Sequence, residues 1–258
     1  MKGFIEEYGK IIVVIILTLL MLGFGQTGLA KPIQNSLLKS TGMITNAHNK
    51  FDEVTKEPEP VTPGAIIDID GTKYVVLEER GNNQALVMTA NSIGGKKFQS
   101  GARSDGQNPN TYEGSAIDNY LENDWYKGLS AKMQSAIQTT DIKQASYAMY
   151  NDLDSKQETG YNGQVYNTIS RHVFLPSVSE IGKAVDLKSP DKVKAFLNGT
   201  SIWTRDSYQG YAYVAEFLGA SIGSLGGGNV YGAFGVRPAF VVNLSGVKYT
   251  IAGHTDYK

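Results

Sequence analysis

The sequence predicts an α+β domain of antiparallel strands and several short helices, preceded by an N-terminal transmembrane helix. Three observations support this fold class. Residues 11–30 form an uncharged apolar run, strand-like residues flank Asp70-Gly71, and apolar residues at three- and four-residue spacing follow Ser115. Because strands repeat every two residues and helices every 3.6, these patterns separate the two element types.

The apolar run "IIVVIILTLLMLGFGQTGLA" lies between Lys10 and Lys31. At about 1.5 Å per residue it would span roughly 30 Å, the thickness of one bilayer core. It predicts an uncleaved anchor over residues 11–30, behind a flank of residues 1–10. The alternative is a cleaved signal peptide, because Gly28-Leu29-Ala30 offers small residues at the positions that a signal peptidase prefers. A single anchor predicts a cell-membrane protein with an extracellular C-terminal domain, although the flanking lysines do not choose an orientation.

Residues 31–63 predict a stalk and linker. Residues 32–51 are polar with weak apolar spacing, and "DEVTKEPEPVTPG" from Asp52 to Gly64 alternates acids with three prolines. Proline disfavours helix and strand interiors, so this stretch predicts an extended spacer. We therefore place the exported domain at residues 64–258.

The domain begins with a predicted hairpin. Asp70-Gly71 supplies the positive φ angles of a tight turn between apolar runs, and a third strand is expected over residues 83–93 after Gly81-Asn82. Asp68 and Asp70 alternate along the end of a strand and into a turn. This pattern indicates that they stabilise the turn and face the solvent. No metal site is predicted here, because no further residue with an oxygen ligand lies at the spacing of a metal-binding loop.

Helices are predicted in the middle of the domain from their capping residues. Ser115 precedes an apolar stripe within residues 113–130, Ser130 precedes a second helix, and Ser177 with Glu180 forms a capping-box pattern. Pro190 stands at the first turn of a last short helix. Residues 141–167, rich in polar residues and tyrosine, predict a long surface excursion.

The final quarter predicts strands at residues 201–207 and 211–217, a glycine-rich turn, and a terminal strand entered through Arg237-Pro238. Proline at that point suits a strand start or an edge. The Arg237 guanidinium is expected to bond carbonyls or a carboxylate and tie the preceding loops to the core. Trp203, Arg205 and Arg237 are therefore predicted to be structural residues.

Composition excludes several function classes. The formal net charge is −1, and no basic stripe with interleaved aromatics is present, so nucleic acid is not a predicted partner. The chain has no cysteine, which removes disulfides, thiol nucleophiles and thiolate metal sites. No cofactor is predicted. No residue near His172 in the sequence is suited to form a catalytic or metal-binding site with it. His172 is therefore predicted to be an ordinary residue at the edge of a strand.

Four segments in order resemble an uncharacterised bacterial domain family, a domain of unknown function. They are "YEGSAIDNYLENDWYKGLS", "VFLPSVSEIGKA", "SIWTRDS" and "FGVRPAFVVNLSG". The resemblance covers residues 63–245 and ends in the family's Gly-Val-Arg-Pro-Ala motif. Thr204 departs from the leucine usual between the Trp and Arg of the third segment.

That family resembles the C-type-lectin-like fold shared with formylglycine-generating enzymes and with the variable proteins of diversity-generating retroelements. The resemblance implies a rigid scaffold that displays loops before its closing motif, here residues 206–234. Formylglycine-generating enzymes depend on cysteine, which this chain lacks. Calcium-dependent lectins bind sugars through acidic and amide motifs, and only Asn108-Pro109-Asn110 weakly resembles such a motif. The N-terminal leader resembles those of small membrane proteins on conjugative elements.

These observations predict a cell-surface display protein that binds an unknown protein or glycan. Its predicted binding face consists of Tyr208, Tyr211, Tyr213, Asn229 and Tyr231, because tyrosines in a glycine-rich setting offer contact area at low entropic cost. An open alternative is that Tyr211 and Tyr213 point into the core. Two other functions stay open: a structural component of a conjugation, secretion or pilus-like apparatus, and a hydrolase.

Overall fold

The computed structural model describes residues 61–147, 153–154 and 156–258. The predicted flank, membrane segment and most of the linker, residues 1–60, lie outside this part of the chain. Residues from Pro60 onward form one compact unit. Within the described ranges, no helix is long and apolar enough to cross a bilayer.

The first sheet, sheet A, contains the hairpin expected from Asp70-Gly71. Its strands are β1 (Ala65–Ile69), β2 (Thr72–Gly81), β3 (Gln84–Thr89), β5 (Ile137–Gln138), β13 (Ala239–Asn243) and β14 (Tyr249–His254). They lie in the order β14-β1-β2-β3-β13-β5, and each pairs antiparallel with its neighbours. Asp70 and Gly71 have φ angles of 51° and 84°, which confirms the predicted turn.

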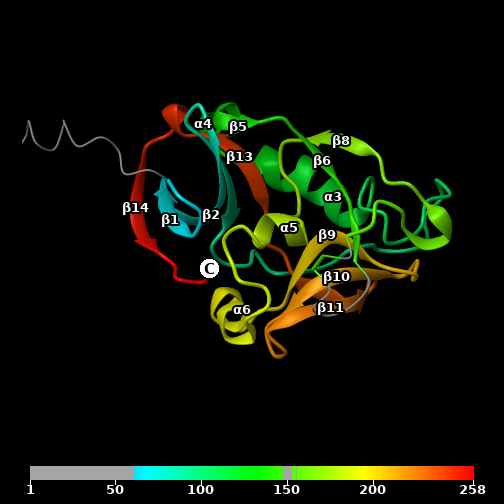
Figure 1. Ribbon diagram of the computed structural model, residues 1–258. Helices are drawn as coiled ribbons and strands as arrows, with labels where there is room; N and C mark the ends of the chain where they lie inside the picture. The colour runs from blue at the N-terminus through cyan, green and yellow to red at the C-terminus, as the bar shows by residue number, and fades with distance from the viewer. Residues whose placement is uncertain (1–60, 148–152, 155) are drawn as a thin grey trace, which may run out of the picture. The chain divides into compact units, whose positions relative to one another are not determined.

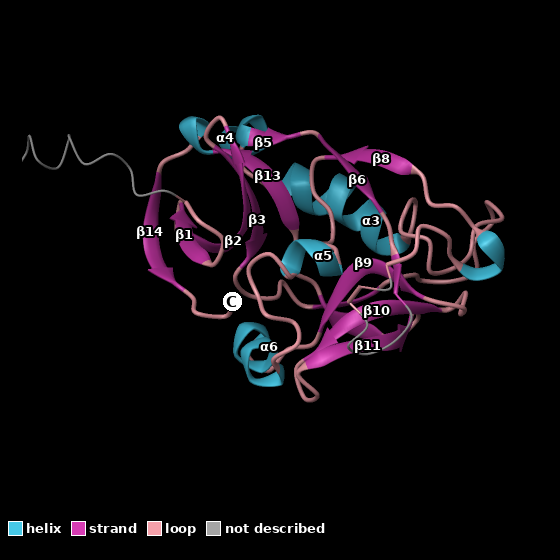
Figure 2. Ribbon diagram, viewed as in Figure 1, coloured by secondary structure: helices cyan, strands magenta, loops and turns pink. Residues whose placement is uncertain are grey.

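The second sheet, sheet B, carries the predicted binding residues. It contains β4 (Gly95–Lys97), β7 (Ser146–Tyr147), β9 (Ile202–Tyr208), β10 (Val214–Gly219), β11 (Ser224–Asn229) and β12 (Ala233–Gly235). The order is β11-β10-β9-β12-β4, and β7 runs parallel to the end of β9. A separate pair consists of β6 (Thr140–Lys143) and β8 (Thr168–Arg171). Figures 1 and 2 show the two larger sheets at opposite sides of this unit.

The helices are short and begin at the predicted capping residues. They are α3 (Ala116–Asn119), α4 (Ala131–Ala136), α5 (Val178–Ile181) and α6 (Pro190–Leu197), with short turns η1 (Tyr120–Trp125), η2 (Tyr126–Gly128), η3 (Tyr161–Gly163) and η4 (Leu244–Gly246). Ser115 and Ser130 cap α3 and α4, and Ser177 forms a full capping box with Glu180 on α5. Helix α5 contacts both β2 and β9, so it links the two sheets. The mixed α+β prediction is confirmed.

Four details of the sequence prediction are wrong. The single helix expected over residues 113–130 is three consecutive segments, because η1 is a π-helical turn and η2 a 3₁₀ turn. The glycine-rich turn contains the strand β11. The strand after Arg237 is not the last, since β14 follows it and pairs with β1. Residues 141–167 are not one surface excursion, because β6 and β7 lie within them and Tyr147 and Tyr166 are buried.

The centre of the unit is held by Arg205, on β9. Its Nη1 and Nη2 donate to the two carboxylate oxygens of Glu180 at 2.6 and 2.9 Å, and Nε donates to the Lys143 carbonyl at 2.8 Å. Both side chains are almost completely buried. Burial alone would raise the pKa of Glu180, but the Arg205 guanidinium lowers it below its usual range.

We expect Arg205→Met to destabilise the fold by about 3–5 kcal/mol, because it leaves the Glu180 carboxyl buried without its cation. Since the folded pKa of Glu180 is lowered, the stabilisation by this pair is present at neutral pH and is lost as the pH falls through that pKa. Urea unfolding at pH 7 and at a series of pH values that falls below 4 measures both effects.

The control is Lys188→Met, which breaks the exposed Lys188–Asp154 pair and should cost about 0–1 kcal/mol. Equal losses in the two variants would show that Arg205 does not hold the core.

Candidate functional site

The five predicted binding residues lie at one end of sheet B. Tyr208 ends β9, Tyr211 and Tyr213 lie in the loop before β10, and Asn229 ends β11. Antiparallel pairing places Ala215 beside Ser207 and Val214 beside Asn229. The topology therefore gathers these residues, with Tyr231 just beyond, at one edge of the molecule. We call the set Tyr208, Tyr211, Tyr213, Asn229 and Tyr231 the tyrosine face.

Tyr211 and Tyr213 are exposed, Tyr208 and Tyr231 are half-buried, and the four rings lie in two pairs. Tyr211 is 60 % exposed and Tyr213 is 53 % exposed, so the alternative that they point into the core is wrong. The ring centroids of Tyr208 and Tyr211 are 5.7 Å apart, and those of Tyr213 and Tyr231 are 6.1 Å apart. Asn229 is exposed and its Oδ1 accepts the backbone N–H of Tyr231.

The loop that carries Tyr211 and Tyr213 is anchored by Asn110. The Nδ2 group of this fully buried amide donates to the carbonyls of Tyr211 and Val214 at 2.8 and 3.0 Å, and its backbone N–H donates to the Ala212 carbonyl. Three hydrogen bonds therefore fix the loop. Sequence reasoning missed this role, because the bonded residues lie about a hundred positions apart in the chain.

Glycines in β11 make room for aromatic rings on both faces of sheet B. A Cβ atom at Gly227 would lie 2.6 Å from the Tyr208 ring, and one at Gly228 would lie 2.8 and 2.9 Å from the rings of Phe234 and Trp203. Both contacts are too close for a side chain. The glycine run is therefore a strand whose missing side chains leave room for the ring of Tyr208 on one face and for that of Trp203 on the other.

Trp203 occupies the centre of this aromatic packing. It is fully buried, its ring lies 4.6 Å from that of Phe234 and 5.6 Å from that of Phe98, and its Nε1 donates to the Lys96 carbonyl at 2.9 Å. The indole thus joins β9 to β4 and β12, and it does not reach the tyrosine face.

Glu216 is a buried acid beneath the tyrosine face. It is paired across the strands with Gly227, which Tyr208 covers. Its side chain is buried, and neither carboxylate oxygen has a hydrogen-bond partner among the described residues. Burial, together with the nearby carboxyl of Asp206, raises the pKa of Glu216 to about 9. Glu216 is therefore protonated and uncharged at neutral pH.

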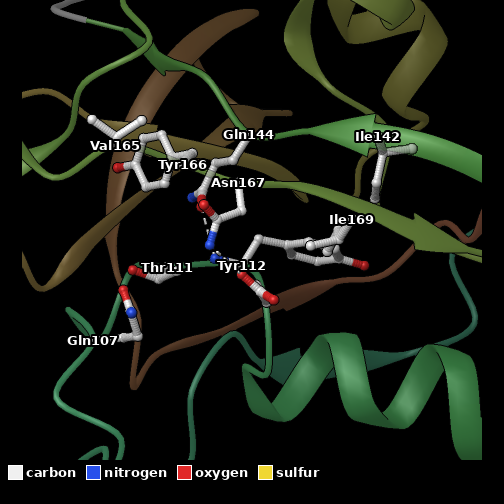
Figure 3. A pocket seen from close by; sticks show the side chains of 10 residues that line it. Gln107, Thr111, Tyr112, Ile142, Gln144, Val165, Tyr166, Asn167 and Ile169 are labelled. Carbon is white, nitrogen blue, oxygen red and sulfur yellow. Dashed lines mark hydrogen bonds between the residues drawn. The ribbon is translucent and has the colours of Figure 1, made fainter.

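The tyrosines of residues 141–167, the predicted surface excursion, have mixed positions. Tyr147 and Tyr166 are buried, which contradicts a surface position, whereas Tyr161 is exposed. Tyr150 lies outside the described residues. Tyr166 also lines a small cavity with Thr111, Tyr112, Gln144 and Asn167 (Figure 3). Its volume is about 10 Å³, which is close to the room needed by one water molecule. This cavity is too small for an organic ligand.

An open groove of about 490 Å³ lies at the other end of β9. Ser92, Gly94, Gly199, Ser201 and Gly235 are among the residues that line it, and Phe234 is its only aromatic. None of the predicted binding residues contributes to it. Binding sites for small molecules are mostly lined by apolar and aromatic side chains, so the small polar lining gives this groove few recognition groups.

Arg237 is buried at a distance from the tyrosine face. Its Nε donates to the Thr89 carbonyl at 2.7 Å and Nη1 to the Phe196 carbonyl at 3.1 Å, and the guanidinium lies 4.3 Å from the centre of the Phe196 ring. Burial lowers the pKa of Arg237 to about 9, which leaves it charged at neutral pH. It joins β3 to α6, rather than the loops that precede β13 as the sequence suggested.

The structure brings His172 into a network that the sequence did not reveal. Its Nδ1 lies 2.6 Å from Glu122 Oε1, and its Nε2 lies 3.2 Å from the Thr139 hydroxyl. A carboxylate only accepts, so Nδ1 carries the proton and, in a neutral ring, Nε2 accepts from Thr139. Glu122 also accepts the N–H groups of His172 and Val173, so the network ties the end of β8 to η1.

No group of three or more metal-ligating side chains occurs within residues 61–147 and 156–258. The tyrosine face itself consists of four phenol side chains and one amide.

We expect the stability of the wild-type fold to fall between pH 6 and pH 9 and that of Glu216→Gln to fall less. The folded state keeps the Glu216 proton up to about pH 9, whereas an unfolded glutamate loses it near 4.3. The folded state then binds more protons, so the free energy of unfolding decreases by up to roughly 1 kcal/mol per pH unit.

Urea unfolding of both proteins across this pH range measures the difference between their free energies of unfolding. The contributions of other titrating groups cancel in that difference, because those groups are present in both proteins. Asp206 affects the pH dependence of stability mainly below pH 6, since burial raises its pKa to about 6. Parallel curves for the two proteins would show that Glu216 is not the titrating group.

Comparison with known proteins gives a family but no characterised relative. No curated protein matches the chain, and no solved structure matches it. A family model for the domain of unknown function DUF6273 matches residues 82–244, more than half of the chain and within the range of the sequence resemblance. The chain belongs to the DUF6273 domain family.

Proposed function

We propose that this protein is a membrane-anchored, cell-surface binding protein that recognises a protein or glycan ligand through the tyrosine face. The exposure of Tyr211 and Tyr213 on a loop fixed by Asn110 is the observation that carries the proposal. Large exposed aromatic side chains on a soluble surface mark interaction sites more often than isolated aliphatic ones do.

The physical support is preorganisation. A binding loop loses conformational entropy when its ligand orders it, and that loss weakens affinity. Here Asn110 already fixes the backbone at three points, and tyrosine has only two side-chain torsions to restrict. Aromatic contact area is therefore presented at low entropic cost.

The arrangement also supports a C-type-lectin-like scaffold as the finer fold assignment. In that proposal the two sheets form the rigid body, and the ends of β9 and β11 with the short connections that follow them carry the binding residues. The closing Gly235–Ala239 segment enters β13, and the tyrosine face is built from the chain just before it. Comparison of an experimental structure with proteins of that fold tests the assignment.

We expect the double substitution Tyr211→Ser and Tyr213→Ser to abolish binding while leaving the melting temperature within about 2 °C of wild type. Exposed side chains contribute little to stability, usually within about 0.5 kcal/mol. Full-length protein is applied to immobilised glycans and peptides, and the variant is compared on every ligand that the wild type retains.

Ile222→Ser is the control, because it removes an exposed apolar side chain from the turn at the opposite end of the β10–β11 hairpin. It should bind as the wild type does. Unchanged binding by the tyrosine variant would remove this face as the site.

Membrane attachment rests on residues 11–30, whose uncharged run matches one bilayer core. We expect the full-length chain to stay with membranes after a carbonate wash. Release of a soluble form that begins at Lys31 would replace the anchor with a cleaved signal peptide.

A further inference from the structure

Strand β14 forms one edge of sheet A and pairs with β1 on one side only. Figure 1 shows it in red at the outer side of the unit. An edge strand presents unpaired backbone N–H and C=O groups, which readily pair with another strand, and proteins usually protect such an edge with charged residues, proline or a short strand. β14 has six residues, without proline and without an acidic or basic side chain before His254 at its end. Its free edge is therefore open to pairing.

The other edge strands among the described residues are less suited to pairing. β5 and β7 have two residues each. β4 contains two lysines, and β6 and β8 contain Asp141, Lys143 and Arg171. β11 is uncharged, but it has three consecutive glycines, which offer no side chains to a partner strand, and Leu225 is only 2 % exposed. β14 is thus the edge that combines length, side chains and absence of charge.

The hairpin between β1 and β2 determines the orientation of the backbone of β14. In a two-residue turn the flanking residues, here Ile69 and Thr72, form a hydrogen-bonded pair. The bonding direction alternates along a strand, so the backbone groups of Asp68 point towards β14, where Asp68 lies opposite Thr250. Thr250 therefore bonds towards β1.

Tyr249 and Ile251, on either side of Thr250, consequently direct their N–H and C=O groups away from β1. The bond from the Thr255 N–H to the Gly64 carbonyl agrees with this alternation, since it continues the same two-residue period. No loop or side chain within the described ranges bonds these outward groups. Tyr249 and Ile251 lie half-buried against the core, and Thr250 is exposed on the opposite face.

We infer that β14 pairs with β14 of a second copy of this chain, antiparallel and about a two-fold axis at Thr250. This inference goes beyond the proposed function and does not rest on the tyrosine face. In this register Tyr249 of each copy lies opposite Ile251 of the other. Because both residues present outward N–H and C=O groups, each of these two pairs exchanges two backbone hydrogen bonds.

The side chains around the axis suit a second copy. Tyr249 beside Ile251 is an aromatic and β-branched pair, and Thr250 meets the same threonine of the second copy; pairs of both kinds stabilise antiparallel strands. A strand that meets its own copy also meets its own charges, and opposed like charges are destabilising. Here Lys248 lies opposite the uncharged Ala252. A self-complementary contact of this kind closes as a dimer.

The contact is short, so the dimer is expected to be weak. Ala252 is left out of register with β1 by a bulge, which confines regular pairing to residues near the axis. Interfaces below the standard size are weak or transient, and we expect a dissociation constant on the order of 10–100 µM. Sheets A and B lie at opposite sides of the unit, so pairing through β14 leaves the tyrosine face of each copy open.

The absence of cysteine from the chain allows a direct test. Thr250→Cys introduces one thiol, and in the proposed register the thiols of two copies lie opposite each other, with their Cα atoms about 4.5 Å apart, a separation that a disulfide spans. Full-length protein in detergent is oxidised with copper phenanthroline and analysed on a non-reducing gel. We expect a covalent dimer.

Ala252→Cys is the matched control, because Ala252 is also exposed on β14. In the proposed register the two Ala252 residues lie four positions apart along the strands, roughly 13 Å, which is too far for a disulfide. We expect roughly tenfold less covalent dimer than from Thr250→Cys. Equal crosslinking of the two variants would overturn the inference.

Thr250→Lys tests the same contact without a crosslink. It places two like charges opposite each other at the axis and should weaken the dimer several-fold, with an unchanged circular dichroism spectrum because the side chain is exposed. Analytical ultracentrifugation of the full-length protein over a concentration series measures the association. A wild type that stays monomeric at every concentration, or a dimer that Thr250→Lys leaves unchanged, would overturn pairing through β14.

Discussion

The buried ion pair between Arg205 and Glu180 is the constraint on which the rest of the domain depends. The guanidinium uses three of its nitrogens to bond Glu180 and the carbonyls of Lys143 and Leu175. Its neighbour Asp206 accepts the N–H groups of Ala145 and Val178. Two consecutive residues of β9 thus fasten α5 and the chain before β7 to one strand. Removing either partner would leave the other charge buried and unpaired, so this geometry fixes all three elements together.

From that fixed centre, β9 determines where the candidate site lies. Trp203 at its start packs against Phe98 and Phe234, and Tyr208 at its end lies over Gly227. The same strand therefore supplies a core anchor at one end and a residue of the tyrosine face at the other. Because β9 is held on both sides by pairing with β10, β12 and β7, the tyrosine face is carried by a central strand, although its loop extends beyond the sheet.

The sequence was sufficient for features whose cause is local. Ser115, Ser130 and the Ser177–Glu180 box mark helix starts, and Asp70-Gly71 marks a hairpin, because each interacts within a few residues. It failed where the cause is distant. The glycines of β11 suggest a turn until the rings that cover them are known, and Asn110 bonds a loop about a hundred residues away. A π-helical turn in η1 also escapes a pattern that recognises only the 3.6-residue period.

The distribution of charge connects the core to the binding proposal. Two ion pairs, Arg205–Glu180 and Arg171–Asp118, hold elements of the domain together. The five residues of the tyrosine face carry no formal charge, so they supply no electrostatic steering to a ligand. Association without steering proceeds at an ordinary rate, and affinity has to come from slow dissociation. Under the proposed function, slow dissociation would require close contact between the ligand and the tyrosine rings, and the loop that carries Tyr211 and Tyr213 is already fixed by Asn110.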